Sequence, residues 1–375
     1  SFFAVGKAWC AICPLALLSD LTHRVSPVTA VMPRWLREHG AWVMAGAFLL
    51  LSWAHAIFDI HGSPLLTGFI FLGLGLSAVV LAVRYERRAF CRFVCPIGMM
   101  GGMYALTSPV TLRASDGACR AGCGKKSCVV APSCKLYEYP RTLDSNRYCV
   151  LCGDCVKECE HNSPRPVLRA PTSELAEIRK PVFAEAVFVI LLVGMILSEV
   201  VRKTPLYPRL MQSLLEWSPL QDYAVVYSFS LVVLLAALVA LAFGVARWSA
   251  PAWKPNFARF GYAFIPLALS GHLGINFYEL YTGGTRSVQT VIDNLQIPLQ
   301  LFEMPPMVRG AIYNYIPELM VVQYAVLLLG LAATLIAIWR LGRKTQVRRT
   351  PYLLFAGALA GLFLAVYAFP MKPGC

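Results

Sequence analysis

Charged residues are scarce in this chain. Of its 375 residues only 14% are Asp, Glu, Lys or Arg, whereas an average soluble domain has about 25%. Hydrophobic residues make up 57% of the sequence, and the mean hydropathy is +0.59. This composition argues against an ordinary soluble domain and predicts an integral membrane protein.

The sequence also lacks the common motifs of catalysis. It has no phosphate-binding loop, no dinucleotide-binding fingerprint and no recognisable arrangement of a nucleophile with a base. These absences argue against a complete enzyme. The chain has no initiator Met and opens at Ser1 inside an apolar stretch, so we expect its natural N-terminus to lie upstream.

Long apolar stretches are the most prominent feature of the sequence. A helix needs about 20 mostly apolar residues to cross a bilayer. Six stretches meet this requirement: 41–60, 65–83, 182–201, 222–244, 317–339 and 352–370. A seventh, 258–278, is interrupted by His272, Asn276 and Glu279, and residues 1–18 resemble the end of a further span. We predict an all-α polytopic membrane protein with about seven or eight transmembrane helices.

One polar insert divides the membrane region. The sequence therefore divides into three predicted parts: a membrane region at 1–109, an insert at 110–180, and C-terminal membrane helices at 181–375. The apolar stretch 96–107 is too short to cross the bilayer. In the C-terminal part, residues 202–221 and 279–316 have amphipathic patterns, and we expect them at the membrane surface opposite the insert.

Basic residues predict the orientation in the membrane. The net charge is +14, which in a soluble protein would suggest a nucleic-acid partner. Here 28 of the 34 Lys and Arg residues fall in segments that the predicted spans place on one side, namely 1–40, 84–181, 245–259 and 340–351. Basic loops face the cytoplasm. We therefore expect a bacterial inner (cytoplasmic) membrane protein with its insert in the cytoplasm and no nucleic-acid partner.

Cysteine is abundant, and the insert holds eight of the thirteen. Cys149, Cys152, Cys155 and Cys159 have the C-x2-C-x2-C-x3-C spacing of bacterial ferredoxins. Zinc is the alternative, but zinc sites usually pair two short motifs across a longer gap. The pattern therefore predicts [4Fe–4S] clusters and a role in electron transfer.

A second group of four cysteines precedes this motif with wider spacing. Its members are Cys119, Cys123, Cys128 and Cys134. In two-cluster ferredoxins the fourth Cys of each run ligates the other cluster. The crossed arrangement gives one ligand set of Cys119, Cys123, Cys128 and Cys159. It gives a second set of Cys134, Cys149, Cys152 and Cys155. The wide spacing leaves this allocation open, and His161, which lies near the position of the usual proline, is either an alternative ligand or a solvated side chain.

Two further cysteine pairs lie at expected membrane boundaries, and each ends in Cys-Pro. The first is Cys10-Ala-Ile-Cys13-Pro14 and the second is Cys91-Arg-Phe-Val-Cys95-Pro96. Together they offer four thiolates, enough for a third cluster or a tetrahedral metal. The alternative is that they are buried free thiols or redox-active disulfides.

These motifs together resemble the membrane polyferredoxins. Cys-x2-3-Cys-Pro elements followed by a two-cluster insert are similar to the NapH- and NosR-type proteins associated with periplasmic nitrate and nitrous oxide reduction. Residues 1–170 carry the resemblance. It implies a ferredoxin-like 2[4Fe–4S] module and transfer of electrons between the quinone pool or cytoplasmic donors and a partner redox protein or complex.

Polar residues within apolar spans are the remaining candidates, because they are costly in hydrocarbon. His55 and His272 are both expected near the outer end of a span. They could bind a quinone, ligate a b-type haem or a metal ion, or be ordinary interfacial histidines.

Two other functions remain open. One is redox-assisted metal transport or cofactor assembly, with a metal path that includes Met304 and Met307. The other is a membrane anchor subunit of a reductase complex.

Overall fold

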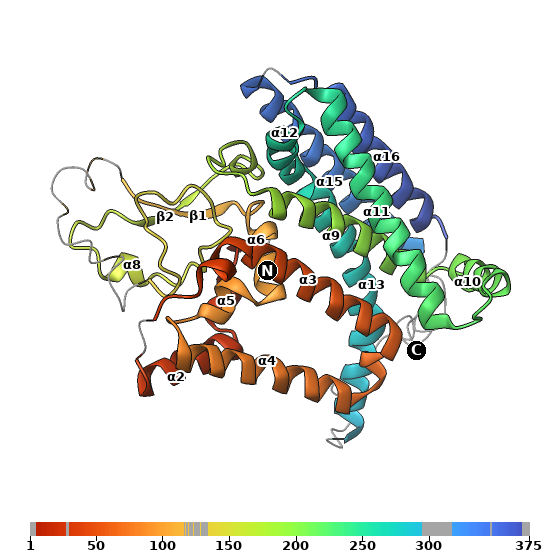
Figure 1. Ribbon diagram of the computed structural model, residues 1–375, viewed down its shortest axis with the longest axis horizontal. Coiled ribbons are helices and arrows are strands. Elements are labelled where there is room, and N and C mark those ends of the chain that lie inside the picture. Colours follow the sequence, from red (N-terminus) through yellow and green to blue (C-terminus); the bar gives the residue numbers. More distant parts are fainter. Residues whose placement is uncertain are drawn as a thin grey trace. The chain divides into compact units, whose positions relative to one another are not determined.

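The computed structural model describes residues 5–27, 30–115, 117, 119, 123, 128, 134–294, 317–345 and 347–369, without the side chains of 61, 281–294 and 317–318. The chain divides into two compact units, Ser1–Phe188 and Val189–Cys375 (Figure 1). The predicted insert 110–180 lies in the first unit together with the N-terminal membrane helices.

The first unit is built from short and long helices around the insert. Its helices are η1 (Ala8–Ala11), α2 (Pro14–Val25), α3 (Arg34–Phe58), η2 (Ile60–Gly62), α4 (Pro64–Arg84), α5 (Ala89–Phe93), α6 (Pro96–Ala105), α8 (Asp154–Lys157) and η3 (Glu174–Ala176), followed by the start of α9 (Phe183–Arg202). α2 packs along α4, and α3 packs against α5 and α6. α6 is almost entirely buried.

The insert contains little regular structure among its described residues. Strands β1 (Val110–Arg113) and β2 (Arg165–Leu168) pair antiparallel, with Val110 opposite Leu168. Between them, α8 is only four residues long. This agrees with the absence of a long amphipathic pattern in the sequence.

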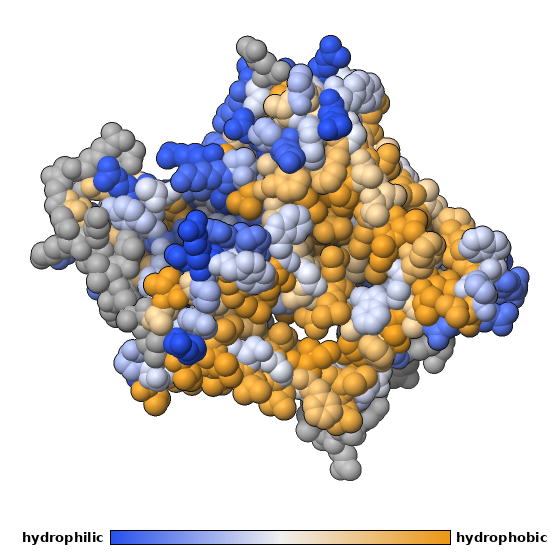
Figure 2. All heavy atoms as spheres, in the orientation of Figure 1, coloured by the Kyte–Doolittle hydropathy of each residue, from blue (hydrophilic) through white to orange (hydrophobic). Residues whose placement is uncertain are grey.

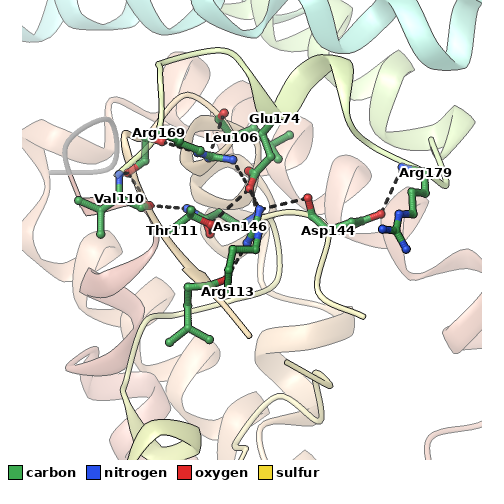
Figure 3. A network of polar contacts seen from close by, with 11 residues as sticks. Leu106, Val110, Thr111, Arg113, Asp144, Asn146, Arg169, Glu174 and Arg179 are labelled. Carbon is green, nitrogen blue, oxygen red and sulfur yellow. Dashed lines mark hydrogen bonds and ion pairs between the residues drawn. The ribbon is translucent and has the colours of Figure 1, made fainter. Parts of the chain in front are cut away.

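A buried carboxylate ties the insert together (Figure 3). Glu174 is fully buried and forms ion pairs with Arg113 on β1 and Arg169 just after β2. It also accepts a hydrogen bond from the backbone N–H of Asn146 at 2.9 Å. The Asn146 side chain in turn donates to the Val110 carbonyl at 2.7 Å. Glu174 therefore fixes the loop that leads into Cys149 against the sheet.

The second unit is helical throughout its described part. It consists of the rest of α9, α10 (Leu206–Trp217), α11 (Tyr223–Ser249), α12 (Trp253–Phe260), η4 (Gly261–Phe264), α13 (Ile265–Asn294), α15 (Pro317–Lys344) and α16 (Thr350–Tyr367). α15 packs against α13 and α16, and α11 packs against α16 and α12. The Asp222 carboxylate caps the start of α11 by accepting from the Val225 N–H at 3.0 Å.

Among the described residues, six helices are long and apolar enough to cross a membrane: α3, α4, α9, α11, α15 and α16. Their exposed surfaces are apolar. Large side chains such as Phe69 and Leu72 on α4, and Phe229 and Val232 on α11, are exposed. Figure 2 shows apolar side chains covering much of both helices. This is the surface expected of a multi-pass membrane protein, since such side chains are stable against lipid.

These six helices coincide with the six clear spans of the sequence. The weaker seventh, 258–278, overlaps η4 and α13 but is not among the six, so the total of seven or eight stays a prediction. Residues 8–18 form η1 and the first part of α2 rather than one continuous span, with a break at Cys13. Helix α6 covers most of the stretch 96–107 and is ten residues long, too short to cross a bilayer.

Candidate metal centres

Both Cys-Pro elements start a helix. Cys13 and Cys95 are the N-cap residues of α2 and α6, and the prolines that follow occupy the first helical turn. Proline is favoured there because its missing N–H would have no helical partner and its φ suits a helix. The sulfur of Cys95 accepts a hydrogen bond from the Gly98 N–H at 3.3 Å. A helix N-terminus favours a thiolate, so the motif presents its second cysteine as a metal donor.

We call Cys10, Cys13, Cys91 and Cys95 the Cys-Pro set. Electrostatic interactions link its members, and their role as ligands of one cluster stays a prediction. Burial raises the pKa of the Cys91 thiol to about 12, with a further contribution from Cys95 and a smaller one from Cys10. Burial likewise raises the pKa of Cys95, with contributions from Cys10 and Cys13. These contributions link the two pairs electrostatically.

Positive charge lies beside this set. Lys7 and Arg88 both lower the pKa of Cys10 and Cys91, although burial outweighs them. Buried thiolates are costly without a compensating cation. Four such groups, flanked by a lysine and an arginine, are suited to hold a metal cluster whose ligands must be deprotonated.

A second group, the proximal insert set, comprises Cys134, Cys149, Cys152 and Cys155. Burial raises the pKa of Cys149 to about 11, and repulsion from Cys152 and Cys134 adds to the rise. Burial raises the pKa of Cys155 to about 12, with contributions from the other three members of the set. Backbone N–H groups point at two of these sulfurs: Leu151 at Cys149 (3.5 Å) and Glu138 at Cys134 (3.3 Å).

The third group, the distal insert set, comprises Cys119, Cys123, Cys128 and Cys159. Burial and repulsion from the other three, Cys159 first, raise the pKa of Cys128. Ser163 connects two members directly: its hydroxyl lies 3.5 Å from the Cys119 sulfur, and its N–H lies 3.5 Å from the Cys159 sulfur. His161 is exposed. Sequence reasoning missed Ser163, for which the cysteine spacing gives no signal.

Electrostatic repulsion associates Cys134 with the second run and Cys159 with the first. The crossed allocation of ligands is compatible with this and stays a prediction. Across the described residues, no three Cys, His, Asp or Glu side chains converge as a site for a single metal ion would require. Hydrogen bonds to cysteine sulfur of the kind seen in all three sets are among the features that set iron–sulfur potentials.

Buried charges position the proximal insert set. Glu185 at the start of α9 accepts from Arg147 at 2.8 Å and from the Tyr148 hydroxyl. These two residues immediately precede Cys149. Both Arg147 and Glu185 are buried. The contacts therefore attach the cysteine loop to a membrane helix within the first unit.

A cavity of about 330 Å³ lies beside Cys91. Its walls include the apolar side chains of Met44 and Met103 and the polar groups of Tyr148 and Glu185. Its size and mixed lining are typical of a small-molecule site. His55 and His272 are not among its lining residues.

The two histidines occupy different units. His55 lies on α3 in the first unit, and His272 lies on α13 in the second. Their joint role in quinone or haem binding stays a prediction. Met304 and Met307 lie outside the described residues.

Comparisons with known proteins match part of the chain. A family described as a 4Fe-4S binding domain matches residues 1–37 and 66–109. These residues include the whole Cys-Pro set and end just before the insert. No solved structure matches the chain.

Curated relatives are electron-transport and ferredoxin-type proteins. The putative electron transport protein YccM of Escherichia coli is 30% identical over 179 residues, which cover 41% of this chain and 48% of the relative. The methylamine utilization ferredoxin-type protein MauN of Methylorubrum extorquens is 32% identical over 129 residues, 32% of this chain and 44% of its own. MauN of Paracoccus denitrificans is 28% identical over 168 residues, 40% of this chain and 56% of its own. The chain spans about half the length of these relatives. The chain is thus similar in part to a 4Fe-4S binding domain and to ferredoxin-type electron transport proteins, as expected of a membrane polyferredoxin.

Proposed function

We propose that this chain is a membrane-bound iron–sulfur electron carrier with three [4Fe–4S] clusters, one for each set of four cysteines. The observation that supports the proposal is that electrostatic interactions among the twelve described cysteines associate them in three sets of four. The residues of the first set fall within the match to a 4Fe-4S binding domain. Such clusters accept and release one electron at a time when bound. The chain's own residues bury and orient the ligands, and Lys7 and Arg88 favour the thiolate forms of Cys10 and Cys91.

The three sets form a series. Cys155 of the proximal insert set interacts with Cys128 of the distal insert set. Arg88 interacts with Cys91 of the Cys-Pro set and with Cys152 of the proximal insert set. These interactions support a series in which the proximal insert set lies between the other two. This order suits transfer between a carrier that meets the insert and an acceptor or donor at the membrane.

We place the clusters on the cytoplasmic side of a bacterial inner membrane. The excess of Lys and Arg on the side of the insert supports this orientation. Reporter fusions test it: a fusion after Gln221 should report the periplasm and a fusion after Arg348 the cytoplasm. The reverse result would contradict the orientation.

Quinone is the membrane partner that the family resemblance suggests. The cavity beside Cys91 and the histidine pair His55 and His272 are alternative locations for it. Oxidation of a short-chain quinol by the protein in liposomes, with Tyr148→Phe and His55→Ala compared, would distinguish them. A higher KM for quinol in the Tyr148→Phe variant would place quinone in the cavity, and a higher KM in the His55→Ala variant would place it at the histidine pair. Neither variant should change the iron content, since Tyr148→Phe keeps the buried Arg147–Glu185 ion pair that holds the cysteine loop.

The direct test of the carrier function is anaerobic reduction followed by EPR. A chain in which Cys91 and Cys95 are both changed to Ser should lose one set of cluster signals and keep the others. The double variant Cys152→Ser, Cys155→Ser should lose a different set. A protein that takes up no reducing equivalents would refute the proposal.

A further inference from the structure

A chain of ion pairs runs from the Cys-Pro set to the proximal insert set. Arg88 binds Asp20 through two contacts, Nη2 to Oδ2 at 2.7 Å and Nε to Oδ1 at 3.0 Å. Asp20 Oδ2 also lies 3.9 Å from the Lys135 ammonium. Lys135 lies 3.4 Å from Asp154 Oδ2. The four charges alternate in sign along the chain.

Each end of this ion-pair chain reaches cysteine ligands. Arg88 donates to the carbonyl of Cys10 at 3.4 Å and interacts with the charge on Cys91. At the other end, Asp154 interacts with Cys152. Lys135 and Asp154 are also the sequence neighbours of Cys134 and Cys155.

The central pair is buried, which makes its charges effective. The Arg88 side chain is 2% exposed and that of Asp20 is 9% exposed. Charges interact more strongly in such an environment than in water. Arg88 also has a left-handed backbone conformation, with φ at 55°, which is rare for a residue other than glycine and is found at functional sites. A guanidinium stays protonated at any physiological pH.

We propose that Arg88 and Asp20 are positioning residues that jointly set and couple the reduction potentials of the Cys-Pro and proximal insert sites. This inference rests on the proposed function, since it assumes a cluster at each site. Arg88 lies close to both sites, so its positive charge favours the reduced state of each. Asp20 has the opposite charge and disfavours it. A shared ion pair keeps the two potentials matched, which suits neighbouring sites in an electron path.

The two residues predict opposite effects. Arg88→Gln removes the positive charge and should lower both potentials, while Asp20→Asn leaves Arg88 in place and should raise both. We expect the oxidised-to-reduced ratio at a fixed potential to change about three- to tenfold in each case, or about 30–60 mV for a one-electron couple. A purely structural ion pair would not give shifts of opposite sign.

The experiment is a redox titration followed by EPR on the full chain in detergent. Variants Cys10→Ser and Cys119→Ser assign the signals of the Cys-Pro and distal insert sites. The distal insert site serves as an internal control, and Glu199→Gln is a matched control because Glu199 is paired with Arg202 at 3.0 Å in the other unit. If the Arg88→Gln protein loses its clusters, the potentials of the Arg88→Lys and Asp20→Asn proteins still test the proposal. Arg88→Lys should leave both potentials near those of the wild type, because it keeps the charge.

The proposal would be supported if the two variants shift the reduction potentials in opposite directions, each at both sites, while the potential of the distal insert site stays unchanged. Unchanged potentials, shifts of the same sign, or a shift at only one site would overturn it. Absence of clusters from the wild-type chain would instead refute the proposed function itself.

Discussion

The carbonyl oxygen of Arg147 lies 2.6 Å from the point that a Cβ atom on Gly102 would occupy. Gly102 is on the buried helix α6, and Arg147 is in the loop that leads to Cys149. The missing side chain therefore lets α6 contact the backbone of the insert.

Gly102→Ala should separate these two elements. Its methyl group would collide with backbone, which cannot move as a flexible side chain does, and overpacking of this kind costs about 1–3 kcal/mol. We expect a lower thermal midpoint in detergent and faster loss of iron on dilution. Gly73→Ala on α4 is the matched control, since nothing lies within 4 Å of its Cβ position. Alanine should stabilise that helix by up to about 1 kcal/mol. Equal behaviour of the two variants would contradict the packing.

Glu185→Gln should destabilise the insert strongly. It keeps the side-chain shape but leaves the buried Arg147 guanidinium without its charge partner, and breaking such a pair costs about 3–5 kcal/mol. Thermal unfolding and iron retention measure the loss. Glu38→Gln removes an ion pair with Arg34 that is largely exposed, and it should cost at most about 1 kcal/mol. A similar cost for both variants would show that the Glu185 contacts do not hold the insert.

Ser163→Ala should lower the reduction potential of the distal insert site. The serine hydroxyl lies 3.5 Å from the Cys119 sulfur, and a hydrogen bond there favours the more negative, reduced cluster. A net hydrogen-bond energy of about 0.5–1.5 kcal/mol corresponds to about 20–65 mV. Ser115→Ala is the control, because Ser115 contacts Ser163 through its backbone. A redox titration that shows no difference between the two variants would exclude this role.

Removal of iron should disorder the insert while sparing the membrane helices. The described part of the insert has two four-residue strands and two short helices of four and three residues, so much of its folding energy should come from cluster binding. We expect limited trypsin digestion to cut the iron-free protein within 110–180, and reconstitution with iron and sulfide to restore protection. Identical digestion of both forms would contradict this account.

The local parts of this fold follow from sequence. Apolar stretches gave the six spans because hydrocarbon requires continuous apolar residues. They did not mark the helix ends: α3 begins at Arg34, before its apolar stretch, because a helix can continue into water with charged residues. Ferredoxin spacing predicts that Cys134 joins the second run and Cys159 the first, and this allocation stays a prediction.

The supporting residues could not be predicted in this way. Arg88 and Asp20 are 68 positions apart, and Arg147 and Glu185 are 38 apart. Such pairs depend on how elements pack in three dimensions, which local spacing does not encode. Ser163 shows the same limit, because it lies four residues beyond Cys159 and contacts a sulfur from another segment of the chain.

The measurement that tests the central claim most directly is the iron and acid-labile sulfide content of anaerobically purified protein, with EPR of the reduced sample. Three four-iron clusters predict about twelve irons and as many sulfides per chain. About eight irons would confine the clusters to the insert and remove the Cys-Pro set from the electron path. Zinc in place of iron would contradict the account of this protein as an electron carrier.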